Sequence, residues 1–180
     1  EQGVAEMSSK CENIYVVGIS MGSVLALHIS SIFPLNAVVF GSTVLKFKDY
    51  IGTRVMTPIF HNIVTTREKR LSYPRNVRDN IKYYGYPVWP LSAVNEMRKL
   101  TNKVKKELHL VNAPALIIQS KKDKLQLPSN TSLVYNSISS KIKEKINLEN
   151  ASHNLFISSP DQLNIFEKIA SFFNKFKNKY

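Results

Sequence analysis

The chain has 180 residues, of which 43% are hydrophobic and 21% charged, and its formal net charge at pH 7 is +12. This length gives room for one domain with a small insertion, and the composition excludes a disordered, collagen-like or coiled-coil chain. No apolar run is long enough to cross a bilayer, and the single cysteine, Cys11, excludes a disulfide framework and a cysteine-based metal cage.

A strand, a helix and a second strand are predicted in the first quarter of the chain. Residues 14–19 form a short β-branched apolar run, which is typical of a strand covered on both faces in a parallel sheet. After a break at Ser20-Met21-Gly22, residues 23–32 show the apolar spacing of a helix, and residues 37–40 are a second buried run. These segments predict a right-handed βαβ unit.

The segment 43–108 loses this alternation and is basic. It holds 14 Lys and Arg residues against 5 Asp and Glu, a net charge of +9, whereas the other 114 residues carry +3. Prolines and aromatic residues divide the segment, and short helices are predicted at about 56–69, 74–84 and 90–108. We therefore predict a helical cap or insertion at 43–108, with a core formed by residues 1–42 and 109–180.

Two interpretations of the basic charge stay open. The charge could attract an anionic surface, or it could be a solvated, lysine-rich surface in a chain that is also rich in Asn and Ile. We favour the second interpretation and expect at most a weak contact with an anionic surface. Nucleic-acid binding is not expected, because no recognisable module or aromatic stacking platform accompanies the lysines.

The strand–helix alternation resumes after the insertion. Residues 115–119 predict a third buried strand, followed by a helix over 129–138. Residues 145–148 are less apolar, so we expect a fourth strand at a sheet edge. Residues 160–176 predict a final amphipathic helix, with Asp161 near its start and lysines near its end.

Gly18-Ile19-Ser20-Met21-Gly22 lies where the first predicted strand meets the first helix. A G-x-S-x-G segment at such a junction is typical of a sharp, strained turn that lifts the serine above the carboxyl end of the sheet. We expect the two glycines to clear space for the turn and the helix N-terminus to favour negative charge on the reacting oxygen. Ser20 is the predicted nucleophile, and an inert serine in a tight turn is the alternative.

A serine nucleophile needs a general base. Of the four histidines, His153 follows the fourth strand in a polar loop, which places it at the same end of the sheet as Ser20. His28 lies within the first helix and is expected to be a packing residue, His61 lies in the insertion, and His109 precedes the third strand. We therefore predict that His153 is the base.

The base in turn needs a carboxylate that holds its tautomer and stabilises its cation. Asp123 follows the third strand on a loop that neighbours the His153 loop. Glu149, at the end of the fourth strand, is the plausible rival, and a solvated Asp123 among lysines is the alternative. We prefer Asp123.

On these residues the chain resembles the α/β-hydrolase fold, and within it the small bacterial carboxylesterases and monoacylglycerol lipases. Three further segments support the resemblance, namely Val111–Gln119, Lys122-Asp123 and Ser152-His153. Ser152 stands where the family usually has glycine. The resemblance implies a mostly parallel sheet flanked by helices, a helical cap, and ester hydrolysis through an acyl-enzyme, with no metal and no organic cofactor.

The same resemblance implies that strands precede the serine motif and that one of their loops supplies an oxyanion-hole amide. In this chain only the amide of Met21 is available, and 13 residues precede the first predicted strand. We therefore expect the chain to correspond to the C-terminal part of such an enzyme. The strand 14–19 would then be an exposed edge through which copies could pair.

Three functions stay open from the sequence. The preferred one is hydrolysis of short- to medium-chain esters or monoacylglycerols, small-molecule substrates of which the aromatic residues of the cap favour an apolar acyl group. The second is a non-catalytic binding protein or inactive fragment that lacks a complete oxyanion hole, and the third is an acyltransferase. Because no leader or membrane span is visible, a cytoplasmic protein is expected.

Overall fold

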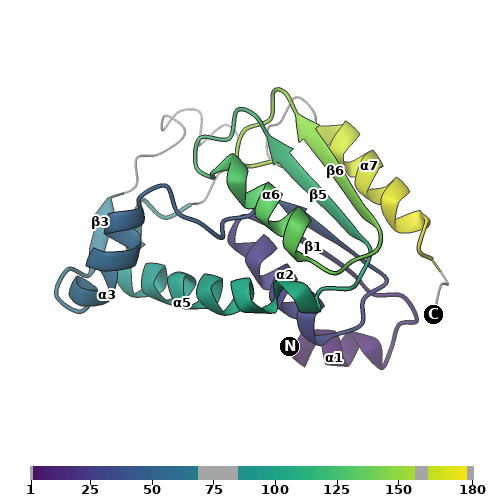
Figure 1. The fold of residues 1–180 in the computed structure, drawn as a ribbon, viewed down its shortest axis with the longest axis horizontal. Helices are drawn as coiled ribbons and strands as arrows, with labels where there is room; N and C mark the ends of the chain where they lie inside the picture. Colours follow the sequence, from purple (N-terminus) through teal and green to yellow (C-terminus); the bar gives the residue numbers. More distant parts are fainter. Residues whose placement is uncertain (1, 69–84, 157–161, 178–180) are drawn as a thin grey trace. The chain divides into compact units, whose positions relative to one another are not determined.

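The computed structural model describes residues 2–68, 85–156 and 162–177, and its contacts divide the chain into two compact units (Figure 1). The first unit comprises residues 1–46 and 101–180, and the second comprises residues 47–100. The second unit lies within the segment predicted as an insertion, and its action as a cap stays a prediction.

The first unit is built on a four-stranded parallel sheet with the strand order β1-β2-β5-β6. The strands are β1 (Tyr15–Ile19), β2 (Ala37–Gly41), β5 (Ala115–Ser120) and β6 (Lys143–Leu148). Both inner strands are buried along their whole length, as continuous apolar runs predict. β6 lies at one edge of the described sheet, which agrees with its mixed composition.

The opposite edge of the described sheet is β1, the strand that leads to Ser20. Its register places Val17 opposite Val39 and Gly18 opposite Phe40 of β2. Val17 is 42% exposed, although it belongs to an apolar strand. Pairing of this edge with a second copy of the chain stays a prediction.

Helices flank both faces of this sheet (Figure 1). α7 (Gln162–Asn174) packs with Ile165, Ile169 and Phe172 against one face, where it meets Val39 of β2 and Ile118 of β5. Alternate residues point to the other face because the side-chain period of a strand is two. α2 (Met21–Ile32) and α6 (Pro128–Ser137) contact β2 and β5 respectively. The two buried layers hold the carboxyl ends of the strands in fixed positions.

Smaller elements complete the first unit. α1 (Gln2–Ser8), which we did not predict, buries none of its residues, and the short 3₁₀ helix η2 (Leu108–Leu110) precedes β5. The fully buried side chain of Asn130, on α6, binds the backbone of Lys46 twice, at 2.7 Å to its N–H and 3.0 Å to its carbonyl oxygen. Asn130 therefore anchors the chain where it leaves the first unit.

In the second unit, the prediction of a helix over 56–69 is wrong for the second half of that range. The helical backbone runs from η1 (Gly52–Met56) into α3 (Thr57–Phe60) and ends there. β3 (Thr66–Glu68) instead pairs antiparallel with β4 (Val88–Pro90). β-branched residues favour extended backbone, and the pairing partner lies too far along the chain for local periodicity to reveal it.

The other two helices predicted for this segment have different outcomes. α5 (Leu91–Glu107) agrees with the helix predicted at 90–108. The helix predicted at 74–84 lies outside the described residues, as do Pro160 and Asp161 at the start of the last helix. Within the described ranges, no helix has both the length and the apolar character that crossing a membrane requires.

Candidate active site

Ser20 occupies the turn between β1 and α2 with a φ of 56° and a ψ of −116°. A serine with positive φ is strained, as the G-x-S-x-G motif predicts. A Cβ built on Gly18 would lie 2.2 Å from the carbonyl oxygen of Gly22, so only glycine fits at 18. A Cβ built on Gly22 would meet nothing within 4 Å. The expectation that both glycines clear space is therefore confirmed for Gly18 and wrong for Gly22.

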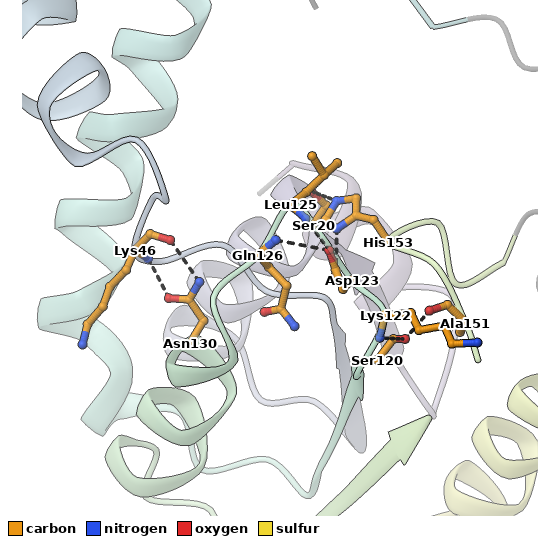
Figure 2. Close-up of polar contacts among 10 residues, drawn as sticks. All are labelled: Ser20, Lys46, Ser120, Lys122, Asp123, Leu125, Gln126, Asn130, Ala151 and His153. Carbon is orange, nitrogen blue, oxygen red and sulfur yellow. Dashed lines mark hydrogen bonds and ion pairs between the residues drawn. The ribbon is translucent and has the colours of Figure 1, made fainter. Parts of the chain in front are cut away.

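The structure brings Ser20, His153 and Asp123 together from three separate loops (Figure 2). His153 Nε2 lies 2.8 Å from Ser20 Oγ, and His153 Nδ1 lies 2.8 Å from Asp123 Oδ2. An ionised carboxylate can only accept, so Nδ1 carries the proton and Nε2 is left to accept the serine hydroxyl. The side chains of Asp123 and His153 are only 1% and 14% exposed.

Asp123 is held by backbone donors as well as by His153. Its Oδ1 accepts the N–H groups of Leu125 at 2.9 Å and Gln126 at 3.2 Å. Burial by itself raises the pKa of the Asp123 carboxyl. The hydrogen bond and charge of His153, together with the two backbone donors, outweigh that effect and hold the pKa below its ordinary value. Asp123 is therefore a carboxylate at neutral pH.

The rival acid, Glu149, is not brought to His153. It pairs with Lys121 at 2.8 Å on the surface, and both side chains are 63% exposed. An exposed pair of this kind contributes little to stability. The structure thus separates the two carboxylates, because Asp123 is buried at the histidine and Glu149 is solvated.

The other histidines lie elsewhere in the chain. His28 is on α2, where its Nδ1 is 2.7 Å from Glu107 Oε2 and its Nε2 is 3.5 Å from Lys103 Nζ. His109 lies in η2, which precedes β5, and His61 follows α3 in the second unit. Among the described histidines, only His153 lies within hydrogen-bond distance of a serine hydroxyl in a strained turn.

The amide of Met21 is the first of helix α2, directly after Ser20. The first N–H groups of a helix have no partner within the helix, and the helix dipole makes this end favourable for negative charge. If Ser20 is the nucleophile that the sequence predicts, the oxygen on the carbonyl carbon under attack would develop such a charge. Among the described residues, no group of three or more His, Cys, Asp or Glu side chains could hold a metal ion.

Sequence reasoning missed several residues that organise this site. The backbone donors of Leu125 and Gln126 had a usable signal, since an aspartate in a loop often accepts N–H groups two and three residues further on. Ser120 had none. Its buried hydroxyl donates to the carbonyl of Ala151, which is 31 positions away.

Comparisons with known proteins agree with this architecture. The family model described as serine aminopeptidase, S33, matches residues 3–160. The thermostable monoacylglycerol lipase of Bacillus sp. (strain H-257) is 26% identical, across 78% of this chain and 54% of that protein. The chain therefore spans about half the length of this curated relative.

Solved structures show the same fold. One from the metagenome-derived lipolytic enzymes LipS and LipT superimposes with a TM-score of 0.83 at 25% identity, covering 97% of this chain and 70% of that one. The Paleococcus ferrophilus monoacylglycerol lipase has a TM-score of 0.80 at 15% identity, covering 98% and 73%. The fold class predicted from the sequence is thus confirmed. The chain belongs to the serine aminopeptidase S33 family and has the α/β-hydrolase fold.

Proposed function

We propose that this chain carries the nucleophile, base and acid of a serine hydrolase that cleaves carboxylic esters through an acyl-enzyme. The observation that carries the proposal is the continuous hydrogen-bonded chain from Asp123 through His153 to Ser20, with both distances at 2.8 Å. The names of the relatives, a monoacylglycerol lipase and lipolytic enzymes, support an ester rather than a peptide substrate.

The proposed reaction begins with proton transfer from Ser20 Oγ to His153 Nε2 while Oγ attacks the ester carbonyl carbon. The tetrahedral intermediate collapses as the C–O bond to the alcohol breaks, and the alcohol leaves with the proton from Nε2. Water then attacks the acyl-enzyme, gives its proton to Nε2, and releases the carboxylic acid while Oγ regains its proton. Asp123 stabilises the His153 cation in both halves.

Stabilisation of the oxyanion is assigned in this proposal to the amide of Met21. The group lies at the N-terminus of α2, directly after the nucleophile. Donors that are already oriented toward developing charge need no reorganisation during the reaction, and one such donor is worth about 3 kcal/mol. The second donor that the family resemblance implies is not among the residues identified in this chain.

The second unit is proposed to act as the cap that selects the acyl group. The segment that runs from Ile51 through η1 into α3 displays apolar side chains at a spacing of four residues, with Ile51, Val55 and Ile59 exposed by 67%, 46% and 61%. Such a stripe suits an apolar acyl chain better than a polar one. Medium-chain esters or monoacylglycerols are therefore the proposed substrates.

The test is labelling of the full-length protein with a fluorophosphonate probe, together with a substrate panel. Ser20 should be labelled in the wild type and not in Ser20→Ala, and p-nitrophenyl butyrate and a monoacylglycerol should be cleaved much faster than an amino-acid anilide. Labelling that persists in Ser20→Ala would refute the assignment, and faster anilide cleavage would favour a peptidase. An added alcohol that captures most of the acyl group would favour an acyltransferase.

The basic charge of residues 43–108 gives a separate test of what the cap contacts. If it attracts anionic lipid surfaces, cleavage of a monoacylglycerol in anionic vesicles should fall steeply as salt rises to physiological strength. A neutral soluble ester is the control and should show no such slope. Equal responses for the two substrates would leave the charge as a solvated surface.

A further inference from the structure

The loop that carries His153 is anchored on both sides of the histidine. Two residues before it, Ala151 is fully buried, and two residues after it, Leu155 is fully buried in the core beneath α7. The N–H of Leu155 also donates to the carbonyl of His153 at 3.1 Å. The histidine therefore has little freedom relative to these anchors, so a contact that holds Ala151 helps to set where the imidazole lies.

Ser120 provides the polar tie to Ala151 (Figure 2). Ser120 is the last residue of β5 and is 2% exposed, and its hydroxyl donates to the carbonyl of Ala151. The same oxygen accepts the N–H of Lys122 at 3.2 Å, at the start of the turn that leads to Asp123. One buried hydroxyl thus contacts both the acid-bearing loop and the base-bearing loop.

Other contacts between the two loops are exposed or lie further from the histidine, as does the backbone hydrogen bond from the N–H of Lys121 to the carbonyl of Leu148 at 2.9 Å. Lys121 pairs with Glu149, and Lys122 Nζ donates to Asn150 at 2.8 Å, but these contacts are exposed to solvent. Exposed ion pairs are screened and have an entropy cost, whereas a buried and satisfied hydrogen bond is stronger in its low-dielectric surroundings. Ser120 is therefore the tie that fixes the distance between the loops near the histidine.

We propose that Ser120 is a positioning residue that holds the Asp123 and His153 loops at a fixed distance from each other, so that the imidazole stays within hydrogen-bond reach of Ser20. The proposal deepens the function proposed above and rests on it. Ser120 touches neither the substrate nor the reacting atoms in this account. It acts through His153, and its loss should lower turnover without changing substrate binding.

The experiment compares Ser120→Ala, Ser120→Thr and Ser140→Ala in the full-length protein. Ser140 is the matched control, because its hydroxyl is also buried, 3% exposed, and donates to a backbone carbonyl, that of Ile142, before β6 begins. Ser120→Ala should lower kcat roughly tenfold to a hundredfold, as expected for a displacement of about 1 Å, with KM unchanged. Ser120→Thr, which keeps the hydroxyl, should restore most of the loss, and Ser140→Ala should keep the wild-type kcat.

Two outcomes of the kinetic comparison would overturn the proposal. One is a Ser120→Ala enzyme whose kcat stays within about twofold of the wild type, far below the loss that misplacement causes. The other is a loss of kcat in Ser140→Ala as large as that in Ser120→Ala, since this would indicate general destabilisation. If Ser120→Ala does not fold, Ser120→Cys takes its place in the comparison, because its slightly larger thiol leaves no cavity and is only a weak hydrogen-bond donor and acceptor.

A readout that needs no activity separates this proposal from the proposed function. In proton NMR spectra, the low-field resonance of the His153 Nδ1 proton reports its hydrogen bond to Asp123. This resonance should shift or broaden in Ser120→Ala and stay unchanged in Ser140→Ala. An unaltered resonance in Ser120→Ala refutes the positioning role even if esters prove not to be substrates, whereas activity that survives in Ser20→Ala refutes the proposed function alone.

Discussion

Two histidine–carboxylate pairs lie in the first unit of this chain and are nearly identical in their first contact. His153 Nδ1 is 2.8 Å from Asp123, and His28 Nδ1 is 2.7 Å from Glu107. The side chains of both histidines are largely buried, at 14% and 11% exposure. By this contact alone, the two pairs could not be told apart.

The second ring nitrogen separates them. Nε2 of His153 faces the hydroxyl of Ser20, whereas Nε2 of His28 lies 3.5 Å from the ammonium group of Lys103. A hydroxyl can give up its proton and become a nucleophile, but the lysine beside His28 is a cation that offers no attacking oxygen. A histidine–carboxylate pair therefore indicates catalysis only when the third atom can react.

The largest expected difference between the two pairs is in kcat after each imidazole is removed. His153→Ala should lower kcat on the order of 10⁴-fold or more, because Ser20 loses its base. His28→Ala should leave kcat at the wild-type level and lower the free energy of unfolding by about 1–3 kcal/mol, since Glu107 loses a buried partner. Steady-state kinetics and denaturant unfolding of the two variants check both values, and a large kcat loss in His28→Ala would contradict the distinction.

The next test replaces each carboxylate with its amide. Asp123→Asn should lower kcat by about 10³- to 10⁴-fold, because an amide can donate to Nδ1 and so favours the wrong imidazole tautomer. Glu107→Gln is the matched change at His28 and should leave kcat unaltered. Kinetics at neutral pH measure both, and equal kcat values for the two variants would show that Asp123 does not orient the base.

The contact between His153 Nε2 and the Ser20 hydroxyl can be tested through the two glycines of the serine motif. Gly18→Ala would place a Cβ 2.2 Å from a backbone oxygen, so the turn must shift and the hydroxyl must move away from His153. A displacement of about 1 Å can cost on the order of 10²-fold in kcat. Gly22→Ala, which meets nothing within 4 Å, should have little effect. Similar losses in both variants would contradict this steric account.

The smallest expected effect is a change of stability in acid. The pKa of Asp123 is lowered in the folded chain from an ordinary value of 3.8, so its contribution to stability is complete above that value and is lost as the pH falls through the folded pKa. The difference in unfolding free energy between the wild type and Asp123→Asn should therefore shrink below about pH 4. Denaturant titrations across the acid range measure it, and a difference independent of pH would argue against the lowered pKa.

Much of the site could be predicted because its signals are local or follow chain order. Ser20 lies in a five-residue motif, and the strain that the motif predicts is present as a φ of 56°. The chain order predicts Asp123 and His153 because each follows a strand whose carboxyl end is at the same edge of the sheet as Ser20. The rival Glu149 satisfied a similar rule, and only its position on the surface separates it from Asp123.

By itself, the sequence determined the strand–helix alternation, the serine turn and the order in which Ser20, Asp123 and His153 follow the strands, because these depend on side-chain period and on contacts within a few residues. Only the tertiary structure decided the pairing of β3 with β4, the spare room at Gly22, and the contact between Ser120 and Ala151. It also decided the distance from His153 to Ser20, which are 133 positions apart. Contacts between distant segments arise from the packing of the sheet and its helices, and no local pattern of residues encodes them.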